Sequence, residues 1–174
     1  MNLLPTDPPG RRPALRPRNT LSPAPLVSRI AKFLRHDWAG RGLLLEALAC
    51  LCWAKLLLLL VPFRWVAPRL GKMQTESPSV ITEEERRLAL RISWAVQSVA
   101  AHVPLGFVCL PQAMAAKWML RRRHLASTLY LGVARPDEVK FTAHAWLRAG
   151  DKILTGRAES RTHTTLATFA EEWS

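Results

Sequence analysis

The chain has 174 residues, a hydrophobic content of 49% and a formal net charge of +12. This length allows one domain with appendages, and the apolar content is enough for a core. The cysteines, Cys50, Cys52 and Cys109, have neither the even count of a disulfide framework nor the spacing of a zinc site. We therefore expect a reducing, cytoplasmic compartment and no metal site, and the lack of any nucleic-acid-binding motif ranks nucleic acid last among partners.

Residues 1–25 are rich in proline and arginine. Such a segment cannot bury enough apolar surface to offset its ordering entropy, so it is predicted to be a disordered tail. Residues 26–75 are predicted to form an apolar helical region that begins with a helix over residues 27–38. Polar residues 71–80 are expected to form a linker, and residues 76–174 the functional core.

An apolar run extends from Leu43 to Val61 and stops at Pro62. Its 19 residues are just enough to cross a bilayer. Glu46 and Lys55 would each cost about 2.5–3.5 kcal/mol near the membrane centre, whereas each leucine returns about 0.5 kcal/mol, so the sum is near zero. The run is therefore predicted to be a helix buried in the protein or against a partner, and membrane contact stays an alternative.

The segment from Thr82 to Glu85 has the pattern of a capping box, with a hydroxyl at the cap and a glutamate three residues later. A helix is predicted from this point to about Ala101. The next helix is predicted to begin at Cys109, because Pro111 and a series of good helix formers follow. A thiol at this position lies near the positive end of the helix dipole, which stabilises negative charge. Gln112, one turn further on, is expected to be a structural amide.

Residues 128–133, 139–148 and 153–157 are predicted to be strands, and the last two are joined by a turn at 149–152. The fold class is therefore α+β, with a helical N-terminal half and a small antiparallel sheet. His144 lies within the second of these strands. A histidine within reach of a thiol can accept its proton and later return it, so Cys109 and His144 are candidates for nucleophile and general base.

The contexts of these two residues resemble the transglutaminase-like cysteine proteases of lasso-peptide biosynthesis. The matching residues are Cys109-Leu110-Pro111-Gln112-Ala113, Leu129-Tyr130-Leu131-Gly132-Val133 and His144-Ala145-Trp146. The resemblance implies a papain-like or transglutaminase-like core and a standalone leader peptidase that cuts a ribosomally made precursor peptide. It also implies a separate leader-recognition protein and a macrolactam cyclase as partners, and a pathway requirement for ATP. No phosphate-binding loop is present for ATP, and no cofactor is expected to bind this chain through a recognisable motif.

One position departs from the pattern of this family, which usually completes its triad with an aspartate about twelve residues after the histidine. Gly156 stands there. The predicted hairpin places residues 155–157 across from His144, and none of them is an acid. Glu159 is the leading substitute for the third catalytic residue, with Asp151, a polar group such as Thr155, a Cys-His dyad or lost activity as alternatives.

Two other functions stay open from the sequence. One is a catalytically weakened adaptor with the same fold, which would hold the precursor peptide on its basic surface. The other is a membrane-peripheral maturation protein that uses the helix from Leu43 to Val61.

Overall fold

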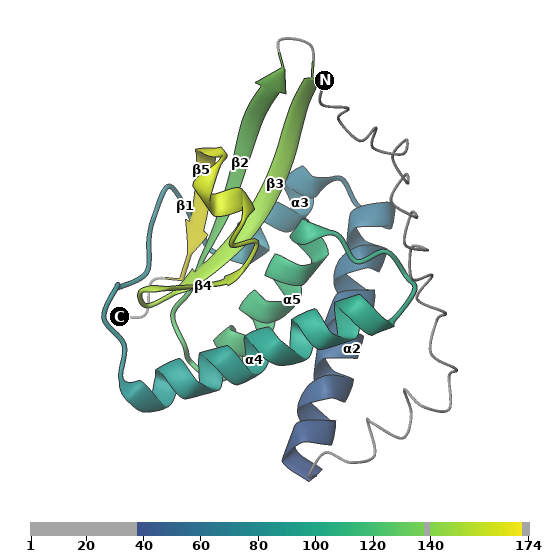
Figure 1. Ribbon diagram of the computed structural model, residues 1–174, viewed down its shortest axis with the longest axis vertical. Helices are drawn as coiled ribbons and strands as arrows, with labels where there is room; N and C mark the ends of the chain where they lie inside the picture. Colours follow the sequence, from purple (N-terminus) through teal and green to yellow (C-terminus); the bar gives the residue numbers. More distant parts are fainter. Residues whose placement is uncertain (1–37, 138–139, 172–174) are drawn as a thin grey trace, which may run out of the picture.

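The computed structural model describes residues 38–137 and 140–171. The predicted tail 1–25 and nearly all of the predicted helix 27–38 lie outside these ranges. The described chain has two layers, a group of helices and a five-stranded antiparallel sheet with strand order β1-β5-β2-β3-β4 (Figure 1). The predicted α+β class is confirmed.

The apolar run forms the helix α2, Trp38–Leu60. It ends before Pro62, whose ring has no N–H to donate to a preceding turn. A short helix α3, Phe63–Val66, and a 3-10 turn η1, Ala67–Leu70, connect α2 to the two-residue strand β1, Lys72–Met73.

The capping box is present at the start of α4, Glu83–His102. The Thr82 hydroxyl accepts a hydrogen bond from the Glu85 N–H at 3.2 Å, and the Glu85 carboxylate accepts one from the Thr82 N–H at 2.7 Å. Two N–H groups that the helix itself cannot satisfy are paired in this way.

The sheet contains the three predicted strands, β2 Thr128–Asp137, β3 Lys140–Ala149 and β4 Lys152–Thr155. A further strand, β5 Thr164–Ala170, was not predicted; it pairs with β2 on the edge away from β3. The predicted meander is therefore one side of a wider sheet.

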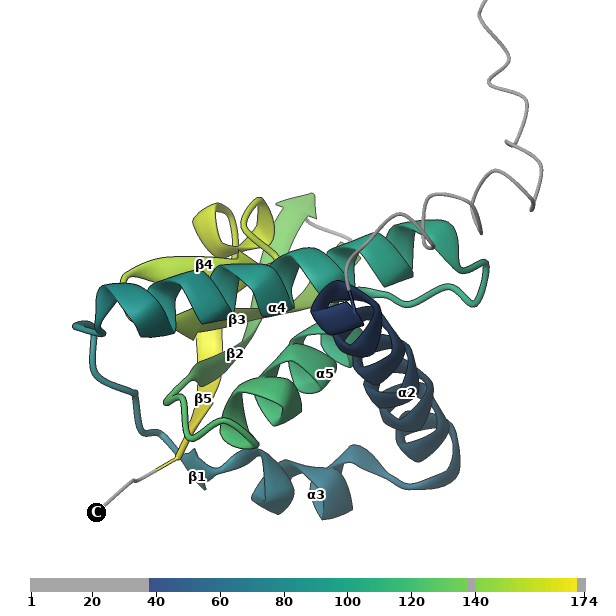
Figure 2. The same ribbon diagram turned by 90° about the horizontal axis from the view of Figure 1, so that it is seen from below.

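The helix α5, Cys109–Arg121, lies between the other helices and one face of the sheet (Figure 2). It packs against α2, α4 and β3, and almost every residue after its first turn is buried. One hydrophobic core continues from α2 through α5 to the sheet. The described residues of the predicted helical region 26–75 and of the predicted core region 76–174 therefore contribute to a single core.

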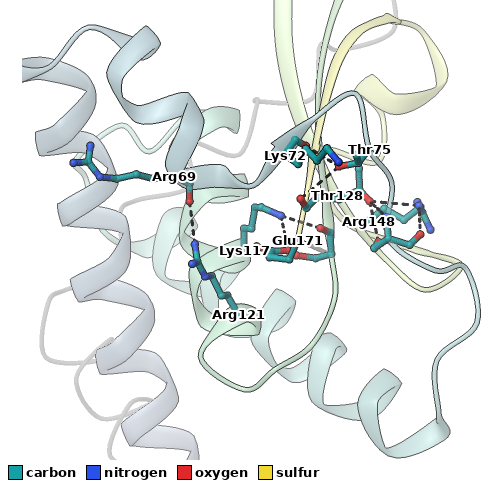
Figure 3. Close-up of polar contacts among 11 residues, drawn as sticks. Arg69, Lys72, Thr75, Lys117, Arg121, Thr128, Arg148 and Glu171 are labelled. Carbon is teal, nitrogen blue, oxygen red and sulfur yellow. Dashed lines mark hydrogen bonds and ion pairs between the residues drawn. The ribbon is translucent and has the colours of Figure 1, made fainter. Parts of the chain in front are cut away.

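A charged group is buried within this core (Figure 3). Lys117 on α5 is fully buried, and its ammonium donates hydrogen bonds of 2.8 Å to the Ser127 carbonyl and to the Glu171 carboxylate. Burial lowers the pKa of Lys117, and the attraction of Glu171 partly opposes this shift. Because Ser127 immediately precedes β2 and Glu171 immediately follows β5, this one side chain fixes α5 to both strands.

The two charged residues in the apolar part of α2 point into the protein. Glu46 accepts hydrogen bonds of 3.0 and 2.6 Å from Arg123, and these bonds lower its pKa. Lys55 donates to the carbonyl of Leu105, in the loop before α5. The charges that argued against a membrane segment are therefore used for internal contacts.

The substitution Lys117→Met is expected to destabilise the protein by about 3–5 kcal/mol, because it leaves the buried Glu171 carboxylate without its counter-ion. Urea denaturation would measure the loss in the free energy of unfolding. The double variant Lys117→Met/Glu171→Leu should recover most of it, since no charge then stays buried. Wild-type stability in the single variant would contradict the assignment of Lys117 as the anchor of α5.

Candidate active site

Cys109 is the first residue of α5, as predicted. Val108 is the cap residue and gives no side-chain hydrogen bond to the helix, while Pro111 has no N–H to satisfy. By helix geometry the N–H groups of Cys109 and Leu110 have no acceptor within the helix. The half-buried thiol therefore lies beside backbone donors that can stabilise a developing negative charge.

The loop before Cys109 is held from two helices. The Gln112 side chain donates a hydrogen bond of 2.7 Å to the carbonyl of Phe107, which confirms its predicted role as a structural amide. The Phe107 ring is buried, and the Lys55 ammonium of α2 lies 5.9 Å from its centre. The backbone entering α5 is thus fixed, and with it the position of the thiol.

His144 lies on β3, directly opposite Gly132 of β2. Two residues further along the strand, Trp146 stacks on Tyr130 with ring centres 5.6 Å apart and nearly parallel planes. A side chain at Gly132 would meet the Trp146 ring at 2.5 Å, so the missing side chain makes room for the indole. Since alternate residues of a strand share a face, His144 belongs to this aromatic face of the sheet.

The other face of the same strands packs on the helices. Ala145 and Leu147 of β3 belong to the hydrophobic core that contains α5, whereas Trp146 does not. His144 therefore faces away from α5, and Cys109 lies on the α5 side. The structure places both residues on the predicted elements, with α5 packed against the face of β3 that carries Ala145 and Leu147 and His144 on the alternate face.

A histidine that sequence reasoning missed lies against His144. The rings of His144 and His163 are 4.6 Å apart between centres and meet edge to face. His163 is itself held by two threonines, with Thr162 Oγ1 3.0 Å from its Nδ1 and Thr142 Oγ1 3.3 Å from its Nε2. The available signal was weak: the threonines and Phe169 of the segment that forms β5 favour a strand, but its apolar and polar residues do not alternate.

The position of the missing aspartate has no room for an acid. Gly156 has φ +69°, a backbone conformation that favours glycine, and an added Cβ would lie 2.7 Å from the Ala145 carbonyl oxygen and 2.8 Å from the Trp146 Cβ. The predicted register is also wrong. Thr155 pairs with Leu147 rather than His144, and the irregularity between Leu147 and Arg148 accounts for one residue of this difference.

The candidate acids take different positions. Asp151 lies in the β3–β4 turn, where it forms ion pairs with Arg86 at 3.5 Å and Lys152 at 2.9 Å. The Glu159 backbone belongs to a 3-10 turn η2, Glu159–Arg161, which contacts β3. Figure 2 shows this yellow turn on the side of the sheet away from α5. The Glu159 side chain lies outside the described part of the structure, so its role stays a prediction.

A cysteine at the start of a buried helix, packed on an antiparallel sheet, defines a cysteine-peptidase-like α+β domain. The family model of the transglutaminase-like superfamily matches residues 57–168, more than half of the sequence, and the chain belongs to this superfamily. This match supports the transglutaminase-like fold predicted from the sequence. Searches of curated proteins and of solved structures gave no match.

The substitution Gly156→Ala should lower the free energy of unfolding by about 1–3 kcal/mol, because the methyl group strains the backbone and meets Ala145 and Trp146. Gly42→Ala on α2 is the matched control, since nothing lies within 4 Å of the added carbon. This control should raise stability by about 0.5–1 kcal/mol through helix propensity. Thermal denaturation compares the two, and equal stability of Gly156→Ala and wild type would contradict the packing described here.

Proposed function

We propose that this chain is a cysteine peptidase that removes the leader from a ribosomally synthesised precursor peptide in lasso-peptide maturation, with Cys109 as its nucleophile. The observation that carries the proposal is the thiol at the uncapped start of α5 within a transglutaminase-like domain. The sequence contexts of Cys109 and His144 support the choice of a precursor peptide as substrate. A leader-recognition protein, a macrolactam cyclase and ATP complete the proposed system.

The chemistry requires two steps. The Cys109 sulfur attacks the carbonyl carbon of the scissile amide, and the N–H groups of Cys109 and Leu110 stabilise the resulting oxyanion. The C–N bond then breaks, the amine leaves with the proton taken from the thiol, and water hydrolyses the thioester. In this proposal His144 carries that proton.

This role requires the His144 segment of β3 to turn toward α5 when the substrate or a partner binds. β4 pairs with β3 only from Leu147 to Ala149, so the part of β3 that contains His144 lies beyond that pairing. The strand there is paired on its β2 side. A rearrangement of this segment leaves the β3–β4 pairing intact, but it has to break or shift the β2–β3 pairing around Gly132 and His144.

Two observations favour a second candidate, a non-catalytic adaptor that binds the precursor peptide. His144 faces away from Cys109, and the backbone at Gly156 excludes the family's aspartate without a local shift. Such an adaptor would use the basic surface of the chain to hold an acidic peptide.

Cleavage of the precursor, followed by mass spectrometry with the recognition protein, the cyclase and ATP present, tests the two functions. Cys109→Ala should reduce cleavage by about 10³-fold or more, as expected for loss of a nucleophile. Cys52→Ala is the matched control, because Cys52 is an exposed cysteine on α2, and its cleavage rate should equal that of wild type.

Cleavage retained in Cys109→Ala would overturn the peptidase proposal. Absence of cleavage by wild type, together with retained binding of the precursor, would establish the adaptor instead. The variant His144→Ala distinguishes precursor binding from bond cleavage. Loss of cleavage without loss of precursor binding would assign His144 to the chemistry.

A further inference from the structure

The outward face of α2 is an apolar stripe. Its exposed residues recur every three or four positions along the helix, with two adjacent pairs, and none of them carries a charge: Trp38, Gly42, Leu45, Ala49, Cys52, Trp53, Leu56, Leu59 and Leu60. Trp53 is 55% exposed and Leu59 is 72% exposed. An apolar surface that continues along a whole helix marks a site of interaction with a membrane or a partner.

The helix is long and apolar enough to cross a bilayer, and only 28% of its most apolar stretch is buried inside the protein. Its inward residues, such as Ala47, Leu51 and Ala54, are completely buried against the rest of the core. Crossing the membrane would pull this face out of the core. The arrangement instead fits a helix that lies along a bilayer surface with one face inserted.

At the C-terminal end of α2 the stripe continues into a groove of about 1040 Å³ between α2, α3 and α5. Three tryptophans line it, Trp53, Trp65 and Trp118, with Arg69 and Arg121 beside them. Tryptophan is enriched at the membrane–water interface, and arginine side chains there reach anionic headgroups. The groove therefore adds an interfacial aromatic and basic edge to the apolar stripe.

We propose that the outward face of α2, together with this groove, docks the protein on an anionic lipid bilayer, with α2 in the plane of the surface. The acid of α2, Glu46, is held inside by Arg123, and the net charge of +12 favours an anionic surface. This inference is independent of the proposed peptidase activity.

Sedimentation of the full chain with vesicles tests the proposal. The chain should bind vesicles of phosphatidylcholine and phosphatidylglycerol more tightly than vesicles of phosphatidylcholine alone. Trp53→Glu/Leu59→Glu should weaken binding to the anionic vesicles by about tenfold or more, because it places charge in the apolar face. Leu166→Glu on β5 is the matched control, since Leu166 is 60% exposed but lies outside the stripe, and it should bind nearly as well as wild type.

Three results would overturn the proposal. The full chain could stay in the supernatant with anionic vesicles, or Leu166→Glu could weaken binding as much as the α2 double variant. A lipid-free dimer in light scattering, converted to a monomer by Trp53→Glu/Leu59→Glu, would assign the stripe to self-association instead. Circular dichroism of the double variant verifies that its fold is retained.

Discussion

The buried ammonium of Lys117 is the interaction on which the placement of the candidate site depends. It binds α5 to the carbonyl just before β2 and to the carboxylate just after β5, so the helix is fixed to the centre of the sheet. Cys109 lies eight residues earlier, or about 12 Å along the helix axis at 1.5 Å per residue. The same helix thus has a polar anchor in the core at one end and a thiol beside uncapped backbone donors at the other.

The sheet divides the candidate catalytic groups between its two faces. One face contributes Ala145 and Leu147 to the core with α5, and the other presents Trp146, His144 and His163. In the described structure the thiol is held at the start of α5, whereas the imidazole belongs to the face of β3 that points away from α5. A peptidase with this chain must change the β3 segment on binding, whereas an adaptor needs no change.

Much of the fold was predictable because its signals are local. The capping box at Thr82, the proline after Cys109 and the apolar run before Pro62 each predicted a helix that is present. The side of the sheet that His144 faces depends on how the strands pack on α5, and the position of Gly156 depends on an irregular β3–β4 pairing. Neither the facing of His144 nor the position of Gly156 has a local sequence signal. The contact between His144 and His163 depends on the position of β5, a strand that was not predicted.

The rate at which iodoacetamide alkylates Cys109 in the free protein, compared between wild type and His144→Ala, tests the central geometry most directly. Peptide mapping by mass spectrometry separates Cys109 from the exposed Cys52, which serves as the internal reference. Because α5 packs on one face of β3 and His144 belongs to the other face, we expect equal Cys109 rates in the two proteins. A drop of about tenfold or more in His144→Ala would show that the imidazole already activates the thiol, and would contradict the arrangement described here.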